Sequence, residues 1–237
     1  MKNTELSIIV PVKNDKVSVI PFVEFINKFL KIKKELIFVL DDKSDETLIS
    51  ILKCKENFKF VSYLINNSAG PKSAVETGFK NINSDIFCIM CVDEIMPIMA
   101  LNKMYNKIYY EDYDFISATR YNRGGKRYGG SLLGKTFSFF ANYSFNILKK
   151  TKLSDHTTGI KMMKKKILSN IKLTSPGKTW AFSFELSLKV LKGNYKVGEV
   201  PIISLDRIFG GQSSFKFFVF FKEYMTWYIW GLTNIKR

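Results

Sequence analysis

Short polar clusters follow the apolar segments in the first half of the chain, and their side chains could bind a phosphorylated ligand. These clusters are Lys13-Asn14-Asp15, Asp41-Asp42, Asn66-Asn67, Asp93-Glu94 and Arg120. Carboxylates and amides hydrogen-bond to sugar hydroxyls and base N–H groups, and an arginine can donate two bonds to phosphate oxygens. Carboxylate oxygens also suit Mg²⁺ or Mn²⁺. The residue types therefore predict a polar site for a phosphate-bearing ligand held partly through a divalent ion.

Alternating strands and helices are expected to position these clusters. Apolar runs predict buried strands at 6–12, 35–40, 58–65, 85–92 and 115–119, and helical spacing predicts helices at 17–32, 45–54, 71–79 and 97–110. This alternation predicts an α/β fold, with a mostly parallel sheet and helices on both faces. Ligands of such sheets bind beyond the carboxyl ends of the strands, where the polar clusters follow.

The second half of the chain is less regular. Residues 121–134 hold five glycines among Arg123, Lys126 and Arg127, which predicts a mobile basic loop. An amphipathic helix is expected to follow, to about Lys150. Residues 199–202 predict an edge strand, and Gly210-Gly211 predicts a flexible turn.

The positive charge of the chain is confined to this second half. Residues 1–120 carry 16 Lys or Arg and 16 Asp or Glu, whereas residues 121–237 carry 21 and 5, which accounts for the whole net charge of +16. This asymmetry indicates an anionic partner, either lipid headgroups, a phosphorylated acceptor or nucleic acid. A generally lysine-rich composition is the alternative explanation. Nucleic acid is disfavoured, because no recognisable nucleic-acid-binding module is present.

The three cysteines are interpreted as structural thiols. Cys88 and Cys91 have the spacing of redox and zinc sites, but the apolar run 85–92 predicts a strand. On a strand, residues three apart point to opposite faces, and no second cysteine pair completes a tetrahedral site. An odd cysteine count without a secretion signal favours a reducing, cytoplasmic compartment.

The C-terminal segment 215–230 is rich in aromatic residues. Lys222 and Glu223 interrupt it, so its apolar runs are shorter than the ~20 residues that span a bilayer. Aromatic residues mixed with lysine favour a helix that lies in the membrane interface, on the inner face of the membrane. Packing against the domain, or a contact that forms a homo-oligomer, remains an alternative.

The order of motifs resembles the family 2 glycosyltransferases of GT-A fold, and among them the polyprenyl-phosphate (dolichol-phosphate-mannose-synthase-like) sugar transferases. The motifs that carry the resemblance are Pro11-Val12-Lys13-Asn14-Asp15, Asp41-Asp42-Lys43-Ser44, Asp93 with Pro97, Arg120-Tyr121 with Gly124-Gly125, Ser154-Asp155-His156-Thr157-Thr158-Gly159, and Arg207 with Gly210 to Ser214. The resemblance implies a glycosyltransferase domain over 1–214, with a donor half at 1–120 and an acceptor half at 121–214, followed by the helix at 215–237.

The resemblance also assigns residues to the nucleotide-sugar donor. It implies that the first two loops hold the nucleoside and that a later basic segment closes on the diphosphate, through Pro11, Lys13, Asp15, Asp41, Asp42, Arg207 and Lys216. The family pattern Asp-x-Asp binds Mg²⁺ or Mn²⁺, and here Asp93 occupies its second position. Cys91 occupies the first position and Ile95 stands where a polar ligand is common, so a thiol replaces one oxygen ligand. Asp93 is expected to hold the ion, with Glu94 helping and the donor diphosphate supplying the other ligands, and weakened or absent metal dependence is the alternative.

On the acceptor side, the resemblance implies that a lipid phosphate meets Arg120, Lys135 and Ser138. The second basic residue of the family falls on Gly134, next to Lys135. Asp155 is expected near the sugar, where it binds hydroxyls or acts as a base, and Glu94 is the other candidate base. The catalytic set implied is Asp93, Glu94, Asp155 and Arg120.

The expected function is an inverting transfer of a sugar from a nucleotide-diphosphate sugar to a membrane-associated acceptor. The acceptor is expected to be polyprenyl phosphate, or else a lipid-linked or surface glycan. The alternative hypothesis is a catalytically weakened protein that binds nucleotide sugars or assembles at the membrane. It is based on Cys91 and Ile95, which stand at positions of the metal motif where oxygen ligands are expected. A nucleotidyltransferase is disfavoured, because no glycine-rich phosphate loop follows the first strand.

Overall fold

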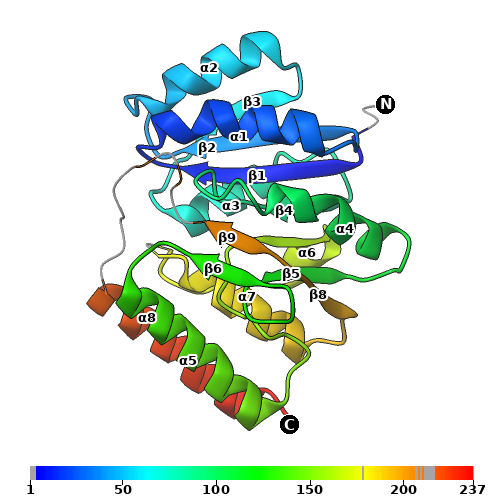
Figure 1. Cartoon of the computed structure of the whole chain (residues 1–237), viewed down its shortest axis with the longest axis vertical. Helices are drawn as coiled ribbons and strands as arrows, with labels where there is room; N and C mark the ends of the chain where they lie inside the picture. Colours follow the sequence, from blue (N-terminus) through cyan, green and yellow to red (C-terminus); the bar gives the residue numbers. More distant parts are fainter. Residues whose placement is uncertain (1–3, 178, 206–207, 209, 211–216, 237) are drawn as a thin grey trace.

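A seven-stranded sheet forms the centre of the molecule (Figure 1). The computed structural model describes residues 4–177, 179–205, 208, 210 and 217–236. The strand order is β3-β2-β1-β4-β7-β5-β8, and only β7 runs antiparallel to its neighbours. The strands are β1 (Leu6–Val12), β2 (Lys34–Leu40), β3 (Val61–Ile65), β4 (Ile86–Ile89), β5 (Phe115–Thr119), β7 (Lys161–Lys164) and β8 (Val197–Pro201). The predicted mostly parallel α/β sheet is confirmed, and β8 is an edge strand as expected.

Helices cover both faces of the sheet. One face packs against α1 (Lys16–Phe29), α2 (Thr47–Asn57) and α4 (Ile98–Tyr109), and the other against α3 (Pro71–Phe79), α6 (Lys166–Asn170) and α7 (Ala181–Lys192). The strands alternate between the two cores: in β2, Leu36, Phe38 and Leu40 join the first, whereas Ile37 and Val39 join the second. Burial on both faces explains why these strands are continuously apolar.

Helix α3 packs closely under the first strand because it contains glycine. A Cβ placed on Gly78 would lie 2.5 Å from Cγ2 of Ile9, which is closer than carbon atoms can approach without a shift. Ala74, one turn earlier, is 1% exposed. Small residues on this side of α3 therefore allow the helix to pack closely against β1.

Two long helices lie together beyond the sheet at the lower left of Figure 1. They are α5 (Leu132–Lys149) and α8 (Phe217–Asn234). A third apolar cluster joins them to α7 through Phe145, Ala181, Phe184, Leu188, Trp227 and Ile235. The C-terminal helix therefore packs against the domain along one side. No helix in the described ranges is both long and apolar enough to cross a membrane.

The structure corrects several boundaries that the sequence suggested. The segment predicted as a mobile loop contains β6 (Lys126–Tyr128), which pairs in parallel with β9 (Ile203–Leu205). The amide of Lys126 donates to the carbonyl of Ile202 at 2.9 Å, a pairing that no local pattern reveals. Strand β4 ends at Ile89, so Cys91 lies in the turn that follows and not on the strand. Gly211, half of the predicted flexible turn, lies outside the described residues.

Candidate active site

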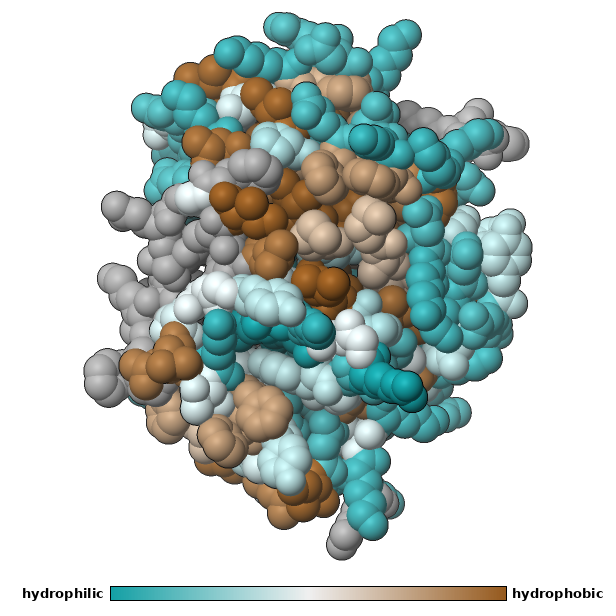
Figure 2. Space-filling view, in the orientation of Figure 1, coloured by the Kyte–Doolittle hydropathy of each residue, from teal (hydrophilic) through white to brown (hydrophobic). Residues whose placement is uncertain are grey.

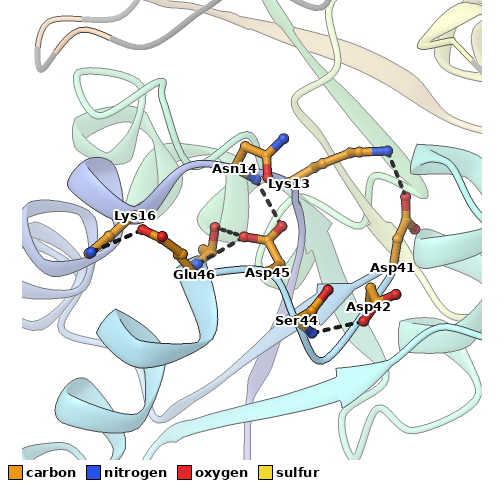
Figure 3. Close-up of a pocket in the computed structure, with 9 residues that line it drawn as sticks. Lys13, Asn14, Lys16, Asp41, Asp42, Ser44, Asp45 and Glu46 are labelled. Carbon is orange, nitrogen blue, oxygen red and sulfur yellow. Dashed lines mark hydrogen bonds and ion pairs between the residues drawn. The ribbon is translucent and has the colours of Figure 1, made fainter.

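A polar cavity of about 470 Å³ lies at the carboxyl ends of β1 and β2 (Figure 3). The loops that follow these strands and the start of α2 line it, with Lys13, Asn14, Lys16, Asp41, Asp42, Ser44, Asp45, Glu46 and Thr47. The structure thus brings together three of the residues expected to bind the donor: Lys13, Asp41 and Asp42. Pro11 and Asp15 are adjacent in the chain but do not line the cavity. Arg207 and Lys216 lie outside the described residues.

Asp41 is held in place by groups from two other loops, the one after β1 and the one after β3. Its carboxylate accepts hydrogen bonds from the Gly70 amide at 3.1 and 3.2 Å and from the Asn66 side chain at 3.3 Å, and Lys13 Nζ lies 3.8 Å away. Gly70 has a φ of 112°, a conformation that glycine adopts without strain. Asp41 therefore ties the loop after β2 to the start of α3.

Asp42 and Asp45 shape the same loop in different ways. Asp42 is exposed and accepts from the Ser44 amide at 2.8 Å, and hydrogen bonds from Ser44 lower the pKa of its carboxyl. Asp45 accepts from the Thr47 amide at the start of α2 at 2.9 Å, and it also accepts from the Asn14 amide at 2.9 Å. Asp42 is left with an ionised, accessible carboxylate.

The turn after β4 contains the residues expected at the metal site. Burial, followed by the charges of Asp93 and Glu94, raises the pKa of the Cys91 thiol well above its usual value, so the sulfur is protonated. Glu94 Oε1 accepts from the Ser204 hydroxyl at 2.7 Å, and Ile95 is buried. Within the described ranges, no three His, Cys, Asp or Glu side chains gather to hold a metal ion. This donor set does not by itself form a divalent-cation site.

The thiol of Cys91 instead serves packing. A Cβ placed on Gly159 would lie 3.1 Å from the Cys91 sulfur and 2.9 Å from the Trp180 ring. The turn after β4, the loop before β7 and the residue that precedes α7 therefore meet at close range. A protonated thiol is a small apolar group and suits this contact.

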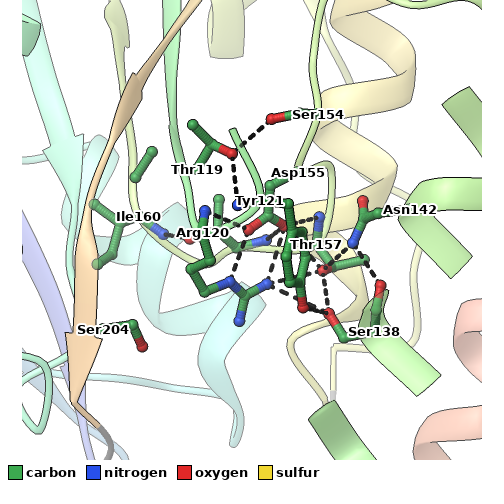
Figure 4. Close-up of polar contacts among 12 residues, drawn as sticks. Thr119, Arg120, Tyr121, Ser138, Asn142, Ser154, Asp155, Thr157, Ile160 and Ser204 are labelled. Atoms are coloured by element: carbon green, nitrogen blue, oxygen red, sulfur yellow. Dashed lines mark hydrogen bonds and ion pairs between the residues drawn. The ribbon is translucent and has the colours of Figure 1, made fainter. Parts of the chain in front are cut away.

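Arg120 and Asp155 form a buried ion pair at the carboxyl end of β5 (Figure 4). Arg120 Nε donates to Asp155 Oδ2 at 2.7 Å and Nη2 donates to Oδ1 at 3.0 Å, the two-bond geometry in which an arginine grips a carboxylate. Nη2 also donates to the Thr157 hydroxyl at 3.0 Å. The side chain of Arg120 is 11% exposed and that of Asp155 is 0% exposed.

The surroundings of Asp155 keep its carboxyl ionised. Burial alone would raise its pKa, but the charge and hydrogen bonds of Arg120 outweigh that effect and lower the pKa to about 2. The amides of Thr157 and Thr158 donate to Oδ1 at 3.2 Å. A carboxylate with no exposed surface and these donors is suited to orienting Arg120 and not to accepting a proton from a ligand.

A second cavity, of about 170 Å³, opens beside this ion pair. It combines two arginines, three hydroxyl-bearing residues and a group of aromatic residues: Arg120, Arg127, Ser131, Gly134, Phe137, Ser138, Ala141, Thr157, Phe220 and Tyr224. Ser138, expected on the acceptor side, lines it, and its hydroxyl accepts from Tyr121 at 2.9 Å. Lys135 lies on α5 but does not line the cavity. Arg127 and Tyr224 were not selected from the sequence, because neither lies in a motif.

Two buried titratable residues support the loop that carries Asp155. Burial lowers the pKa of His156 to about 3, and its neutral ring contacts Asn142 Oδ1 at 3.0 Å and the Thr151 hydroxyl at 2.8 Å. Burial also lowers the pKa of Lys161 to about 7, and its amine donates to Ser117 Oγ at 3.2 Å and to the His156 carbonyl at 3.4 Å. Lys161 is the first residue of β7, a four-residue strand with a lysine at each end, and nothing in the sequence distinguishes the buried lysine from the partly exposed one.

Solved structures with this fold bind nucleotides. The glucosyl-3-phosphoglycerate synthase of Mycobacterium tuberculosis, in complex with Mn²⁺, UDP and phosphoglyceric acid, aligns with a TM-score of 0.74 at 12% identity, over 99% of this chain and 80% of that one. A mannosyltransferase of Pyrobaculum calidifontis, in complex with GDP-Man and Mn²⁺, aligns with a TM-score of 0.69 at 12% identity, over 98% and 65%. The likeness confirms the expected GT-A fold.

Curated relatives and a family model match the sequence itself. The dolichol-phosphate mannosyltransferase of Pyrococcus furiosus is 26% identical over 202 residues, which are 83% of this chain and 55% of that protein. The dodecaprenyl-phosphate galacturonate synthase of Rhizobium johnstonii is 25% identical over 178 residues, which are 73% and 52%. The chain thus spans about half the length of the curated relatives it matches. The model described as glycosyl transferase family 2 matches residues 7–172, and the chain belongs to that family.

Proposed function

We propose that this protein transfers a sugar from a nucleotide-diphosphate sugar to a polyprenyl phosphate, with inversion at the anomeric carbon. The observation that carries the proposal is the second cavity, which we call the acceptor cavity. It places Arg120 and Arg127 beside Phe137, Phe220 and Tyr224. Guanidinium groups suit a phosphate and aromatic side chains suit a hydrocarbon chain. The cavity at the ends of β1 and β2, which we call the donor cavity, would take the nucleoside, with Asp42 accepting hydrogen bonds from the ribose or the base.

In the proposed reaction, a phosphate oxygen of the acceptor attacks the anomeric carbon as the bond to the donor diphosphate breaks. The acceptor phosphate is already ionised at neutral pH, so the step needs no strong general base. This requirement agrees with Asp155, whose buried carboxylate is bonded to Arg120 and has a pKa of about 2. Asp155 would hold Arg120 in position, and Arg120 would hold the nucleophile. A single displacement produces inversion.

Charge on the leaving diphosphate must be stabilised as the bond breaks. Lys13 lies at the rim of the donor cavity, and Arg207 and Lys216 remain the basic residues proposed to close on the diphosphate. The solved neighbours hold Mn²⁺ or Mg²⁺ with their nucleotides. Because Cys91 is protonated here, we propose that a cation would bind through Asp93 and depend mainly on ligand oxygens, so metal dependence is weak.

The outer surface of the acceptor half supports a membrane-bound acceptor. Seven large apolar side chains of α5 are exposed by 46 to 77%: Leu132, Leu133, Phe139, Phe140, Tyr143, Ile147 and Leu148. Figure 2 shows apolar side chains gathered over this part of the molecule. Helix α5 also lines the acceptor cavity with Phe137, Ser138 and Ala141. A bilayer against α5 would bring a lipid phosphate to the cavity, with the protein peripheral on the inner face.

A sugar-transfer assay tests the proposal. Purified protein is incubated with radiolabelled UDP- and GDP-sugars and with polyprenyl phosphate in detergent or vesicles, and the lipid phase is analysed for a sugar phosphate ester. We expect labelled lipid with at least one donor and none with the corresponding polyprenol. If label were found in a glycan and not in the lipid, the acceptor would be a glycan and not polyprenyl phosphate. No transfer to any acceptor, together with retained nucleotide binding, would favour the alternative of a catalytically weakened binding protein, which the protonated Cys91 motivates.

A further inference from the structure

The acceptor cavity has a second guanidinium that comes from a different element than the sequence pattern suggested. The resemblance places a basic residue on the first turn of α5, but that position is Gly134. Gly134 lines the cavity without a side chain, and the neighbouring Lys135 does not line it. Arg127, from β6, lines the same cavity. The positive charge that Gly134 does not supply from α5 is therefore supplied to the cavity by Arg127, from the two-stranded sheet of β6 and β9.

The pairing of β6 with β9 directs Arg127 toward the cavity. Side chains alternate along β6: Lys126 and Tyr128 are exposed, whereas Arg127 between them is half-buried. Its register partner on β9 is Ser204, which is 1% exposed. Tyr224 lines the same cavity as Arg120 and Arg127, and the charges of both arginines oppose the rise in the pKa of its hydroxyl that burial causes.

The two arginines differ in what already binds them. Arg120 is paired with Asp155 at 2.7 Å, so much of its hydrogen-bonding capacity is used. Arg127 has no carboxylate within ion-pair distance among the residues that the structure describes. Among the described residues, the lining contains hydroxyl groups and no Asp or Glu. A half-buried guanidinium without a carboxylate, beside a second one, is the arrangement that a doubly charged anion stabilises.

The same two-stranded sheet contacts the donor side. The hydroxyl of Ser204 donates to Glu94 Oε1 at 2.7 Å, and Glu94 lies in the turn after β4. Because Ser204 stands opposite Arg127 in the register, the same pair of strands carries the cavity arginine and a bond to the turn that contains Asp93. The strands that carry Arg127 are thus connected to the donor side, whereas a basic residue at position 134 would be carried by α5.

We propose that Arg127 is the second phosphate-binding residue of the acceptor site and that it replaces the basic residue absent at Gly134. This inference rests on the proposed function, since it assigns a residue to the acceptor phosphate. The ligand recognised is a phosphate monoester with an apolar chain: the two guanidinium groups bind the dianion, and Phe137, Phe220 and Tyr224 contact the chain.

The test measures binding of geranyl phosphate to the full chain by calorimetry, with inorganic phosphate and geraniol as separate ligands. Arg127→Gln should weaken geranyl phosphate binding by about 10- to 100-fold, the range expected for loss of one charged hydrogen-bond partner. Arg123→Gln removes the same charge from an exposed site in the turn before β6 and should leave binding unchanged. Arg127→Lys should give an intermediate loss, because an ammonium cannot donate two bonds in one plane.

A relocation variant separates a specific contact from a general effect of charge. Adding Gly134→Arg to Arg127→Gln should recover most of the affinity, since it returns the positive charge to the cavity from α5. Affinity for UDP or GDP, measured on the same samples, should stay constant and shows that the variants are folded.

If wild-type protein binds no geranyl phosphate, the proposed acceptor class fails and this inference fails with it. If wild-type protein binds it and Arg127→Gln binds equally well, only the role of Arg127 is refuted. Equal affinity for inorganic phosphate would refute the part assigned to the apolar chain.

Discussion

Arg120 and Asp155 form a buried ion pair in which each side chain depends on the other. Asp155 is 0% exposed and accepts both guanidinium bonds, while Arg120 reaches the acceptor cavity with the rest of its donors. Removing one partner of such a pair leaves an uncompensated charge away from water, which typically costs ~3–5 kcal/mol. The pair therefore links the folding of the loop at 154–159 to the orientation of the residue proposed to bind the acceptor.

A double-mutant cycle measures this dependence. Asp155→Asn and Arg120→Gln should each lower the free energy of unfolding by ~3–5 kcal/mol, and the double variant should lose less than the sum. Urea unfolding at pH 7 gives the values. The exposed pair Lys16–Glu46, with 52% and 74% exposed side chains, is the control and should couple by less than ~1 kcal/mol. Additive losses at Arg120 and Asp155 would contradict the ion pair.

His156 should make the protein less stable in mild acid. Its folded pKa is about 3 because burial disfavours the charged ring, whereas an unfolded histidine titrates near ~6.5. Between these values the unfolded state binds more protons, so the contribution of His156 to stability is complete above pH ~6.5 and is lost as the pH decreases toward 3, by up to ~1.4 kcal/mol per pH unit. Asp155 adds a similar loss only below pH ~4, because its folded pKa is about 2.

The measurement is urea unfolding of wild type and His156→Gln between pH 4.5 and 7. Glutamine keeps a donor and an acceptor for Asn142 and Thr151 but does not titrate. We expect His156→Gln to have a lower free energy of unfolding at pH 7 and a shallower decline toward pH 4.5. Parallel curves would show that His156 does not titrate on unfolding.

The protonated thiol at Cys91 leads to a prediction on metal dependence. Only Asp93 supplies a motif carboxylate, so Mn²⁺ should increase the affinity for GDP or UDP by no more than ~10-fold, or ~1.4 kcal/mol. Asp93→Ala should abolish that increase. Asp85→Ala, an exposed carboxylate at the other end of β4, should leave it intact. Calorimetric titrations of the nucleotide in the presence of Mn²⁺ and of EDTA give the ratio of the two affinities. A ratio much larger than ~10 would refute the proposed weak metal dependence.

At the scale of elements, α5 is an amphipathic helix with two functions assigned to its two sides. One side lines the acceptor cavity and packs on α7 through Phe145, and the other exposes the apolar residues proposed to meet the bilayer. Helix α8, expected from the sequence to be the interfacial helix, buries Trp227 against the domain, as does Ile235 just after its end, and it exposes Phe221 and Ile229. The structure therefore shifts most of the proposed membrane contact to α5.

Substitutions on α5 test this assignment. Leu133→Gln and Phe140→Ser replace side chains that are 65% and 60% exposed, so they should leave stability nearly unchanged. Each should weaken binding to vesicles by about 10-fold, since each removes roughly 1.5 kcal/mol of apolar burial in the bilayer. Met99→Gln, at a 54% exposed position on α4, is the control and should bind as wild type does. Vesicle sedimentation provides the bound fraction, and unchanged binding in both α5 variants would rule out this face.

The elements of the donor half were predictable because local patterns match their environment. The apolar runs that end at Val12 and Leu40 are buried on both faces, and Asp41 follows directly at the cavity. The elements β6, β7 and β9 were missed because each has only three or four residues and is stabilised by distant partners. Arg127 could not be selected for the same reason: its place in the cavity depends on the pairing of β6 with β9.

At the scale of the whole molecule, the boundary near residue 120 separates both the net charges of the two halves and the residues that line the two cavities. The donor cavity belongs to residues 1–120, which carry no net charge, and the acceptor cavity belongs mainly to residues 121–237, which carry the whole excess of +16. One continuous sheet joins the halves through β4 and β7. A molecule of this kind should orient at an anionic surface with its acceptor half toward the lipid and its donor half toward the solvent.

This orientation predicts a salt dependence that separates the two halves. Binding to vesicles of phosphatidylglycerol and phosphatidylcholine should weaken by about 10-fold or more between 0.05 and 0.5 M NaCl, because salt screens attraction between exposed charges and anionic headgroups. Affinity for UDP or GDP should change much less, since the nucleotide is held by local hydrogen bonds in a half without net charge. Vesicle sedimentation and calorimetry at matched salt concentrations provide the two curves. Equal binding to pure phosphatidylcholine would show that apolar insertion alone attaches the protein, and the charge excess would then need a different partner.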